Sequence, residues 1–190
     1  MNYIDSTYTD TLEVKQSKFI AFLTPFSQYE KTLTELKQEH PKARHFVVAY
    51  RHLNEYEQIV EYSSDDGEPK GTSGRPSLFV LQGAQLINTA VIVVRYFGGT
   101  KLGPGGLVRA YSDVINLSLL KAKLLEYKKE EEIEIQFEYS NIRMVEYECD
   151  ELNIEIIQKS FDNQTLYKIK GSKESIDLFL KKMNRLVEVI

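Results

Sequence analysis

The distribution of glycine constrains the fold of this chain more than any other feature of its sequence. Nine of the ten glycines lie between Gly67 and Gly106. Within that stretch the run TAVIVVRYF, residues 89–97, is apolar and β-branched, which is typical of a strand covered on both faces. The loop GGTKLGPGG, residues 98–106, follows directly, and an amphipathic helix is predicted over residues 107–125. The sequence therefore predicts a strand, a glycine-rich loop and a helix in immediate succession.

Positive charge is concentrated around this succession. No Asp or Glu occurs between Pro69 and Ser112, and that stretch contains five cations: Lys70, Arg75, Arg95, Lys101 and Arg109. Glycine lets backbone N–H groups approach an anion closely, and the first turn of the following helix adds unpaired N–H groups and the positive end of its dipole. We therefore predict that these cations bind phosphate or nucleic acid together with the loop glycines, which are Gly98, Gly99, Gly103, Gly105 and Gly106.

Other interpretations of the glycine loop stay open. It is not a Walker A loop, which ends in Gly-Lys-Ser/Thr, and it does not match the G-x-G-x-x-G dinucleotide fingerprint in register. A tight connection that needs glycine only for close packing is the structural alternative. Of the aromatic residues near the loop, Tyr96, Phe97 and Tyr111 are candidates for base stacking, although core packing is the more common role and is expected for at least two of them.

An acidic segment, SSDDGEP at residues 63–69, lies about twenty residues before the buried strand and contains three carboxylates: Asp65, Asp66 and Glu68. Carboxylates this close together can bind a hard cation such as Mg²⁺ or act as a general base, so they form a possible metal or polar site. Asp66-Gly67 is also a strong turn signal, and an acidic loop with a purely structural role is the alternative. We predict no catalytic residue, no bound metal and no cofactor.

The first part of the chain predicts further strands and two helices. Residues 11–26 have the pattern of one extended strand, and Ser27 is placed to cap the helix that follows. A second helix is predicted to start after Thr72 or Ser73 and to continue through Leu86. Two short strands are expected between these helices, at residues 45–50 and 58–62.

The charged run EYKKEEE, residues 126–132, is the one break in composition, and we place a domain boundary there. The predicted domains cover residues 1–128 and 131–190. The second one has the order strand, helix, strand, strand, helix, strand, which is the ferredoxin-like βαββαβ arrangement. Ser172 is expected to cap its last helix, and Asp162-Asn163 to form its hairpin. The expected elements are residues 133–139, 141–152, 154–159, 165–170, 173–185 and 186–190.

Composition and charge limit the class of protein. The net charge of −4 argues against indiscriminate coating of nucleic acid, but residues 1–128 carry about +1 and residues 129–190 about −5. No apolar run approaches the roughly 20 residues of a membrane span, and no secretory signal is visible, so we expect a cytoplasmic protein without membrane contact. Cys149 stands alone, which excludes an internal disulfide, and His45 and His52 lack the neighbours of a zinc site.

Two long motifs resemble the signatures of a known family. DDGEPKGTSGRP at residues 65–76 and VVRYFGGTKLGPGGLVRAY at residues 93–111 are similar to those of the IMPACT/YigZ family, and the resemblance covers the whole chain, as in the bacterial members. It implies an α+β fold, with a two-layer α/β sandwich of the ribosomal-protein-S5-domain-2-like type followed by a ferredoxin-like domain. It also implies a similarity to the last two domains of elongation factor G. Eukaryotic members regulate translation and carry an additional N-terminal partner-binding domain, which this sequence lacks.

These observations lead to one principal functional hypothesis and two alternatives. The principal hypothesis is a non-enzymatic, translation-associated regulatory protein that binds RNA or the ribosome through the basic glycine-loop face. One alternative is an enzyme acting on a phosphorylated small molecule or a nucleotide, which requires the two motif loops to face each other across one cleft. The other is a regulator that binds only a protein partner.

Overall fold

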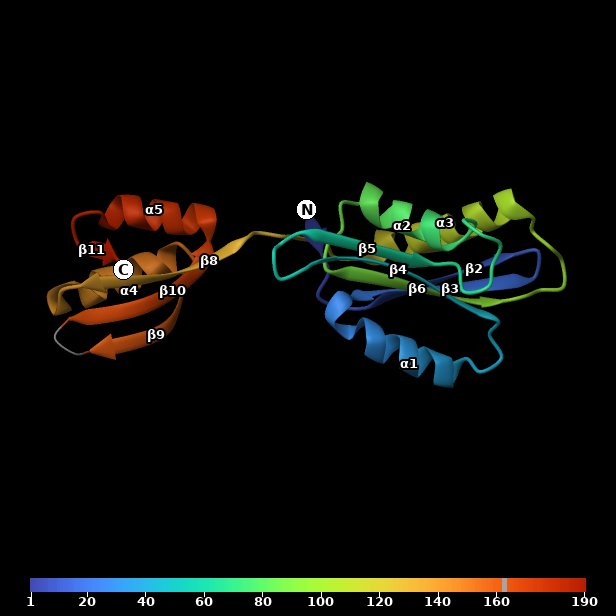
Figure 1. The fold of residues 1–190 in the computed structure, drawn as a ribbon, viewed down its shortest axis with the longest axis horizontal. Coiled ribbons are helices and arrows are strands. Elements are labelled where there is room, and N and C mark those ends of the chain that lie inside the picture. The colour runs from blue at the N-terminus through green and yellow to red at the C-terminus, as the bar shows by residue number, and fades with distance from the viewer. Residues whose placement is uncertain (162–163) are drawn as a thin grey trace. The chain divides into compact units, whose positions relative to one another are not determined.

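The computed structural model describes residues 1–161 and 164–190, which form two compact units, Met1–Tyr127 and Lys128–Ile190 (Figure 1). The division between them falls inside the charged run at residues 126–132. Each unit has its own antiparallel sheet, its own helices and its own hydrophobic core, so the predicted α+β fold class is confirmed. None of the helices in the described residues combines the length and the apolarity that a membrane crossing requires.

The first unit is built on a five-stranded antiparallel sheet with the order β2-β3-β6-β4-β5. Helices α2 and α3 pack on one face of this sheet and α1 covers part of the other (Figure 1). A short two-stranded sheet joins β1 to β7 near the chain start. The elements are β1 (Asn2–Tyr3), β2 (Tyr8–Val14), β3 (Ser17–Pro25), the 3-10 turn η1 (Phe26–Gln28), α1 (Tyr29–Glu39), β4 (His45–Leu53), β5 (Ile59–Ser64), α2 (Gly74–Gly83), β6 (Thr89–Tyr96), α3 (Pro104–Lys121) and β7 (Leu125–Glu126).

The central strand β6 divides the core of this unit into two layers. Val91 and Val93 pack with α2 and α3, whereas Ile92 and Val94 face the α1 side. All four are fully buried, which confirms the prediction of a strand covered on both faces. Burying an aliphatic side chain of this size stabilises a fold by about 1.5–3 kcal/mol. The strand that leads into the glycine loop is therefore firmly held.

Two of the boundaries predicted for the start of the chain are wrong. Residues 11–26 do not form one strand, because β2 and β3 make a tight hairpin in which Lys15 and Gln16 take positive φ values of 48° and 64°. Neither residue type signals such a turn. Ser27 does not cap a helix either; it lies inside η1, and α1 starts at Tyr29 with Gln28 in the N-cap position.

The helices of the motif region also differ in detail from prediction. Ser73 does occupy the N-cap position of α2, but its own side chain makes no capping hydrogen bond; the N–H of Gly74 donates to Asp65 Oδ1 instead, at 2.8 Å. The helix ends at Gly83, short of Leu86, because Gln85 takes a left-handed φ of 54°. Helix α3 starts earlier than predicted, at Pro104, so the last three loop residues belong to its first turn.

The second unit has the ferredoxin-like arrangement predicted for it. Its four strands pair in the order β11-β8-β10-β9, and Ser172 caps the last helix by accepting a hydrogen bond from the N–H of Ser175 at 3.1 Å. The predicted hairpin at Asp162-Asn163 lies outside the described residues. The elements are β8 (Glu130–Phe137), the 3-10 turn η2 (Tyr139–Asn141), α4 (Ile142–Glu151), β9 (Glu155–Phe161), β10 (Thr165–Ser172), α5 (Lys173–Met183) and β11 (Val187–Val189).

Candidate functional site

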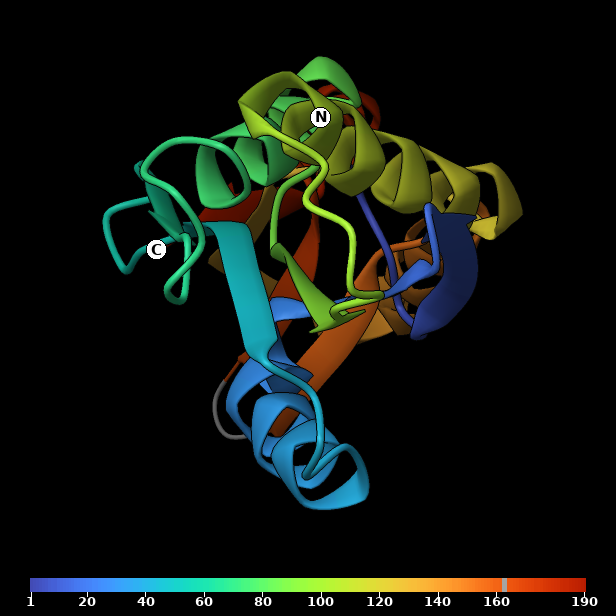
Figure 2. The ribbon, with the colours of Figure 1, turned by 90° about the vertical axis from the view of Figure 1, so that its right-hand side faces the viewer.

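The two motif loops lie together at one edge of the first sheet. Strands β5 and β6 both pair antiparallel with β4, so they run in the same direction and end at the same edge. The acidic loop, residues 65–73, follows β5, and the glycine loop, residues 97–103, follows β6 (Figure 2). Between them lies a cleft of about 430 Å³, which we call the loop cleft. Its lining includes Arg44, His45, Glu68, Arg95, Phe97, Lys101 and Gly103.

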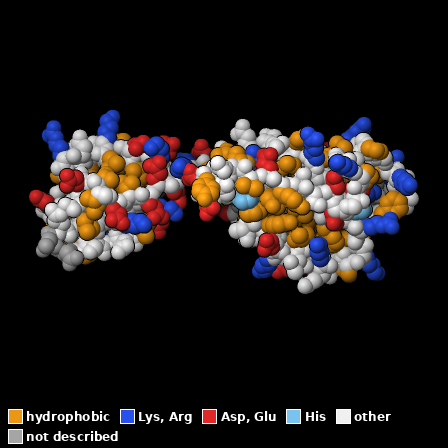
Figure 3. Space-filling view, viewed as in Figure 1, with side chains coloured by type: hydrophobic (Ala, Val, Ile, Leu, Met, Phe, Trp, Pro, Cys, Tyr) orange, Lys and Arg blue, Asp and Glu red, His pale blue; other side chains and the backbone are white. Residues whose placement is uncertain are grey.

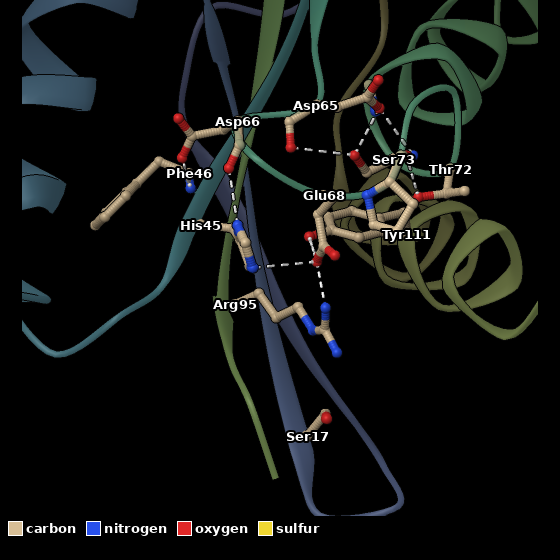
Figure 4. A network of polar contacts seen from close by, with 12 residues as sticks. Ser17, His45, Phe46, Asp65, Asp66, Glu68, Thr72, Ser73, Arg95 and Tyr111 are labelled. Atoms are coloured by element: carbon tan, nitrogen blue, oxygen red, sulfur yellow. Dashed lines mark hydrogen bonds and ion pairs between the residues drawn. The ribbon is translucent and has the colours of Figure 1, made fainter. Parts of the chain in front are cut away.

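Arg95 and Glu68 form a buried ion pair on this cleft. The Arg95 residue is 5% exposed and Glu68 8% exposed, and a guanidinium nitrogen of Arg95 donates a hydrogen bond to Glu68 Oε1 (Figure 4). The hydroxyl of Tyr111 donates to the same oxygen at 2.9 Å. Burial raises the pKa of Tyr111, and the neighbouring Glu68 carboxylate raises it further, so the phenol stays protonated. The charge of Arg95 is thus largely compensated inside the protein.

Asp65 and Asp66 hold the acidic loop in shape. Asp65 accepts hydrogen bonds from the backbone N–H groups of Gly71 and Gly74, each at 2.8 Å, and from the backbone and hydroxyl of Ser73. Burial works to raise the pKa of Asp65, but these hydrogen bonds together outweigh it, and the pKa lies below its usual value. The side chain of Asp66 accepts from the N–H of Phe46 at 2.6 Å.

This loop therefore has a structural role in which all three carboxylates take part. Across the described parts of the chain, no group of three or more His, Cys, Asp or Glu side chains is arranged to hold a metal ion. The carbonyl oxygen of Asp66 also fixes His45, whose Nδ1 lies 2.8 Å from it, and His45 Nε2 lies 3.9 Å from Glu68 Oε1. The ring of His45 is thus held between the Asp66 carbonyl and the Glu68 carboxylate.

Three glycines of the loop, Gly98, Gly99 and Gly103, are required by the backbone. An added Cβ at Gly98 would lie 2.0 Å from the carbonyl carbon of Gln16, and the N–H of Gly98 donates to Ser17 Oγ at 3.1 Å. Gly103 has a φ of 74° and occupies the N-cap position of α3, where no side chain caps the helix. An L-residue with a side chain is strained in that conformation. Gly99, with a φ of 88°, lies in the same region, and the remaining predicted glycines, Gly105 and Gly106, lie in the first turn of α3.

The other predicted cations are exposed. Lys101 lines the loop cleft, Arg75 lies over the ring of Phe79 at 5.3 Å, and Arg109 projects from α3. In the part of the chain that the structure describes, none of these three nor Lys70 has an acidic partner within 4.0 Å. Figure 3 shows Lys and Arg side chains gathered at this end of the first unit.

A second hollow adjoins these cations. It has a volume of about 610 Å³, lies between α2 and α3, and includes Gly71, Arg75 and Val108 in its lining. Because Pro69 lines the loop cleft and Gly71 the second hollow, Lys70 lies on the ridge between the two. Lys101 thus lines the loop cleft, Arg75 lines the second hollow, and Lys70 and Arg109 are exposed and adjacent in sequence to residues that line them. We call Lys70, Arg75, Lys101 and Arg109 the edge cations.

Sequence reasoning missed two residues of the cleft and left a third unresolved. Arg44 and His45 lie at the start of β4, which reaches the same edge because it runs antiparallel to β5 and β6. The strand order would have indicated them, but no local motif marks them. Of the three aromatic candidates for stacking, Tyr111 is fully buried, Tyr96 shares a hydrogen bond with His40, and Phe97 is 41% exposed beside the cleft.

The fold and the cleft define an α+β protein with a glycine-loop cleft between the ends of two sheet strands. The family described as "Impact N-terminal domain" matches residues 15–119. An "IMPACT family member" of Haemophilus influenzae is 36% identical over 173 residues, which cover 88% of this chain and 82% of that protein. "IMPACT family member YigZ" of Escherichia coli K12 is 34% identical over 160 residues, covering 83% and 78%. The chain belongs to the IMPACT family.

A solved structure agrees with this fold. A crystal structure of a hypothetical protein matches all of this chain and 95% of its own, with a TM-score of 0.68 and 28% identity. The two-domain translational regulator Yih1 matches 64% of this chain and 47% of its own, with a TM-score of 0.37 and 23% identity. The first of these supports the arrangement of a five-stranded and a four-stranded antiparallel sheet, each with its helices.

Proposed function

We propose that this protein binds RNA, free or in the ribosome, through the edge cations around the loop cleft. The observation that carries the proposal is that the acidic side chains at this edge are paired within the protein and the exposed basic ones are not. The three carboxylates of the acidic loop, Asp65, Asp66 and Glu68, are all engaged inside the protein. The edge cations, in contrast, are exposed and have no acidic partner within 4.0 Å among the residues that the structure describes. The edge therefore presents positive charge on a chain whose net charge is −4.

Local positive charge suffices for binding phosphates, because at physiological ionic strength electrostatic fields act over a Debye length of about 8 Å. Cations of this kind contact the phosphate backbone, which supplies affinity without reading sequence. The exposed ring of Phe97 adds a surface on which a base can stack. Arg95 supports the site rather than contacting phosphates freely, because its charge is shared with Glu68.

Co-sedimentation with ribosomes at low salt tests this proposal. The full chain should co-sediment, and Lys101→Glu combined with Arg109→Glu should abolish the association. Lys37→Glu together with Lys31→Glu is the matched control, because it makes the same charge change on α1, at the opposite face of the sheet. Association that survives the edge double variant, or that is lost equally in the α1 control, contradicts the proposal.

A second candidate function, an enzyme acting on a phosphorylated small molecule, is favoured by one observation. The two loops do face each other across one cleft, which His45 lines; its Nδ1 is fixed by the Asp66 carbonyl and its Nε2 lies 3.9 Å from Glu68 Oε1. An imidazole held in this way can act as a general base. The test incubates the protein with the four common ribonucleoside monophosphates. Release of inorganic phosphate that His45→Ala abolishes would support this candidate, and no release from any of these nucleotides would count against it.

A further inference from the structure

The loop cleft contains an excess of positive charge. Arg44, Lys101 and Arg95 line it together with His45, and Glu68 is the single carboxylate of its lining. That carboxylate already accepts hydrogen bonds from Arg95 and Tyr111. Arg44 and Lys101 have no acidic partner within 4.0 Å among the residues that the structure describes. An anion that enters the cleft therefore meets two uncompensated cations.

One donor of the cleft is unsatisfied. Arg95 is only 5% exposed, and its Nε has no hydrogen-bond partner among the described residues. The rings of Phe19 and Phe97 lie 5.3 and 5.8 Å from its central guanidinium carbon, which restrains the plane of the group. A buried donor without a partner is rare in proteins and calls for an explanation. Arg95 lines the cleft, but its Nε is buried, so a ligand oxygen becomes the missing acceptor only when the guanidinium group turns toward the cleft.

The start of α3 borders the same cleft. Gly103 and Pro104, the N-cap and first residue of this 18-residue helix, line it, and no side chain caps the helix. The first-turn N–H groups of a helix have no acceptor within the helix, and its positive dipole end favours an anion. The Arg95 side chain, the exposed cations Arg44 and Lys101 and the start of α3 thus border one space.

We propose that the loop cleft binds a phosphate monoester on a nucleoside, either at the end of an RNA strand or in a free nucleotide, with the base against Phe97. This inference rests on the proposed function and specifies the group that the cleft recognises. A monoester carries about −1.5 to −2 charges near neutral pH and three free oxygens, whereas an internal diester carries about −1 and two. The cleft offers more cations and donors than a diester can engage. Its volume of about 430 Å³ falls within the range of small-molecule sites.

Calorimetric titration of the full chain tests the inference. The ligands are one single-stranded hexaribonucleotide with a 5′-phosphate, with a 3′-phosphate and with hydroxyls at both ends, together with adenosine monophosphate and inorganic phosphate. We expect at least one phosphorylated end to bind about tenfold or more tightly than the hydroxyl form. Adenosine monophosphate should bind more tightly than inorganic phosphate, because only the nucleotide has a base to stack on Phe97.

Two exposed residues locate the preference in the cleft. Lys101→Ala and Arg44→Ala should each remove most of the advantage of the phosphorylated end. Lys70→Ala, on the ridge outside the cleft lining, should weaken the binding of all three RNAs by a similar factor and leave the preference for the phosphorylated end unchanged. Lys37→Ala on α1 is the control and should change neither the affinity for RNA nor this preference. All four side chains are exposed, so the fold is preserved.

The possible outcomes separate the inference from the proposed function. Equal binding of the three RNAs overturns the inference and leaves RNA binding intact. Binding of adenosine monophosphate that Lys101→Ala abolishes, without binding of any RNA, supports the monoester site and overturns RNA binding. Binding of no ligand overturns both. An advantage of the phosphorylated end that persists in Lys101→Ala and Arg44→Ala places the monoester elsewhere and overturns the inference.

Discussion

Removing the Glu68 carboxylate should destabilise the first unit strongly. Glu68→Ala leaves the charge of Arg95, a residue that is only 5% exposed, without compensation. It also leaves the hydroxyl of the fully buried Tyr111 without its acceptor. Breaking a buried ion pair on one side costs about 3–5 kcal/mol, and an orphaned buried hydroxyl adds about 1–3 kcal/mol where the two effects do not overlap. We therefore expect Glu68→Ala to lower the free energy of unfolding of the first unit by about 3–5 kcal/mol.

Amide hydrogen exchange of β6, followed by mass spectrometry, measures this loss in the first unit without interference from the second. A loss of 3–5 kcal/mol corresponds to exchange through global opening that is roughly 150- to 5,000-fold faster. Glu13→Ala, an exposed glutamate on β2, is the matched control and should change stability by less than about 0.5 kcal/mol. In a double-mutant cycle with Arg95→Met, the two changes should couple by about 1–3 kcal/mol. If Glu68→Ala behaves like Glu13→Ala, the buried ion pair has been misinterpreted.

Three further predictions concern single residues. In urea unfolding, Gly98→Ala should destabilise the first unit by about 1–3 kcal/mol, because the new Cβ meets the Gln16 backbone. Gly105→Ala should stabilise α3 by about 0.5–1 kcal/mol, because the new Cβ there finds open space. The opposite order of stabilities would be inconsistent with the loop geometry. The lowered pKa of Asp65 means that its contribution to stability is present above the unfolded value of 3.8 and is lost as the pH falls through the folded value, so Asp65→Asn should flatten the stability curve at acid pH. Burial raises the pKa of Cys149 to about 11, so Ellman's reagent at about pH 8 should label this thiol only as fast as the second unit opens; immediate labelling would refute its burial.

The sequence predicted the elements whose signals are local. The β-branched run of β6, the glycine loop and the helix after it have distinct residue patterns, and each is present in the structure. The hairpin at Lys15 and Gln16 could not be predicted in this way, because its two positive-φ residues are neither glycine nor asparagine. The cap predicted for Ser27 failed because the 3-10 turn η1 delays the start of α1.

The site was predictable in part, since its cations and glycines belong to the two motifs. Its internal pairing was not, because Glu68 contacts Arg95 and Tyr111 across separations of 27 and 43 residues. Only the strand order brings these side chains to one edge. The same tertiary contacts distinguish Arg95, which is buried and paired, from Lys101, which is exposed, although the sequence gives both the same chemical character.

The salt dependence of RNA binding tests the central claim most directly. If the four edge cations each neutralise one phosphate of a single strand, the logarithm of the binding constant should fall against the logarithm of salt with a slope of about −2.8. Lys101→Glu with Arg109→Glu should reduce the magnitude of this slope by about half, and the α1 double variant at Lys31 and Lys37 should leave it unchanged. Affinity that is independent of salt, or a slope that the edge variant does not change, would contradict the account.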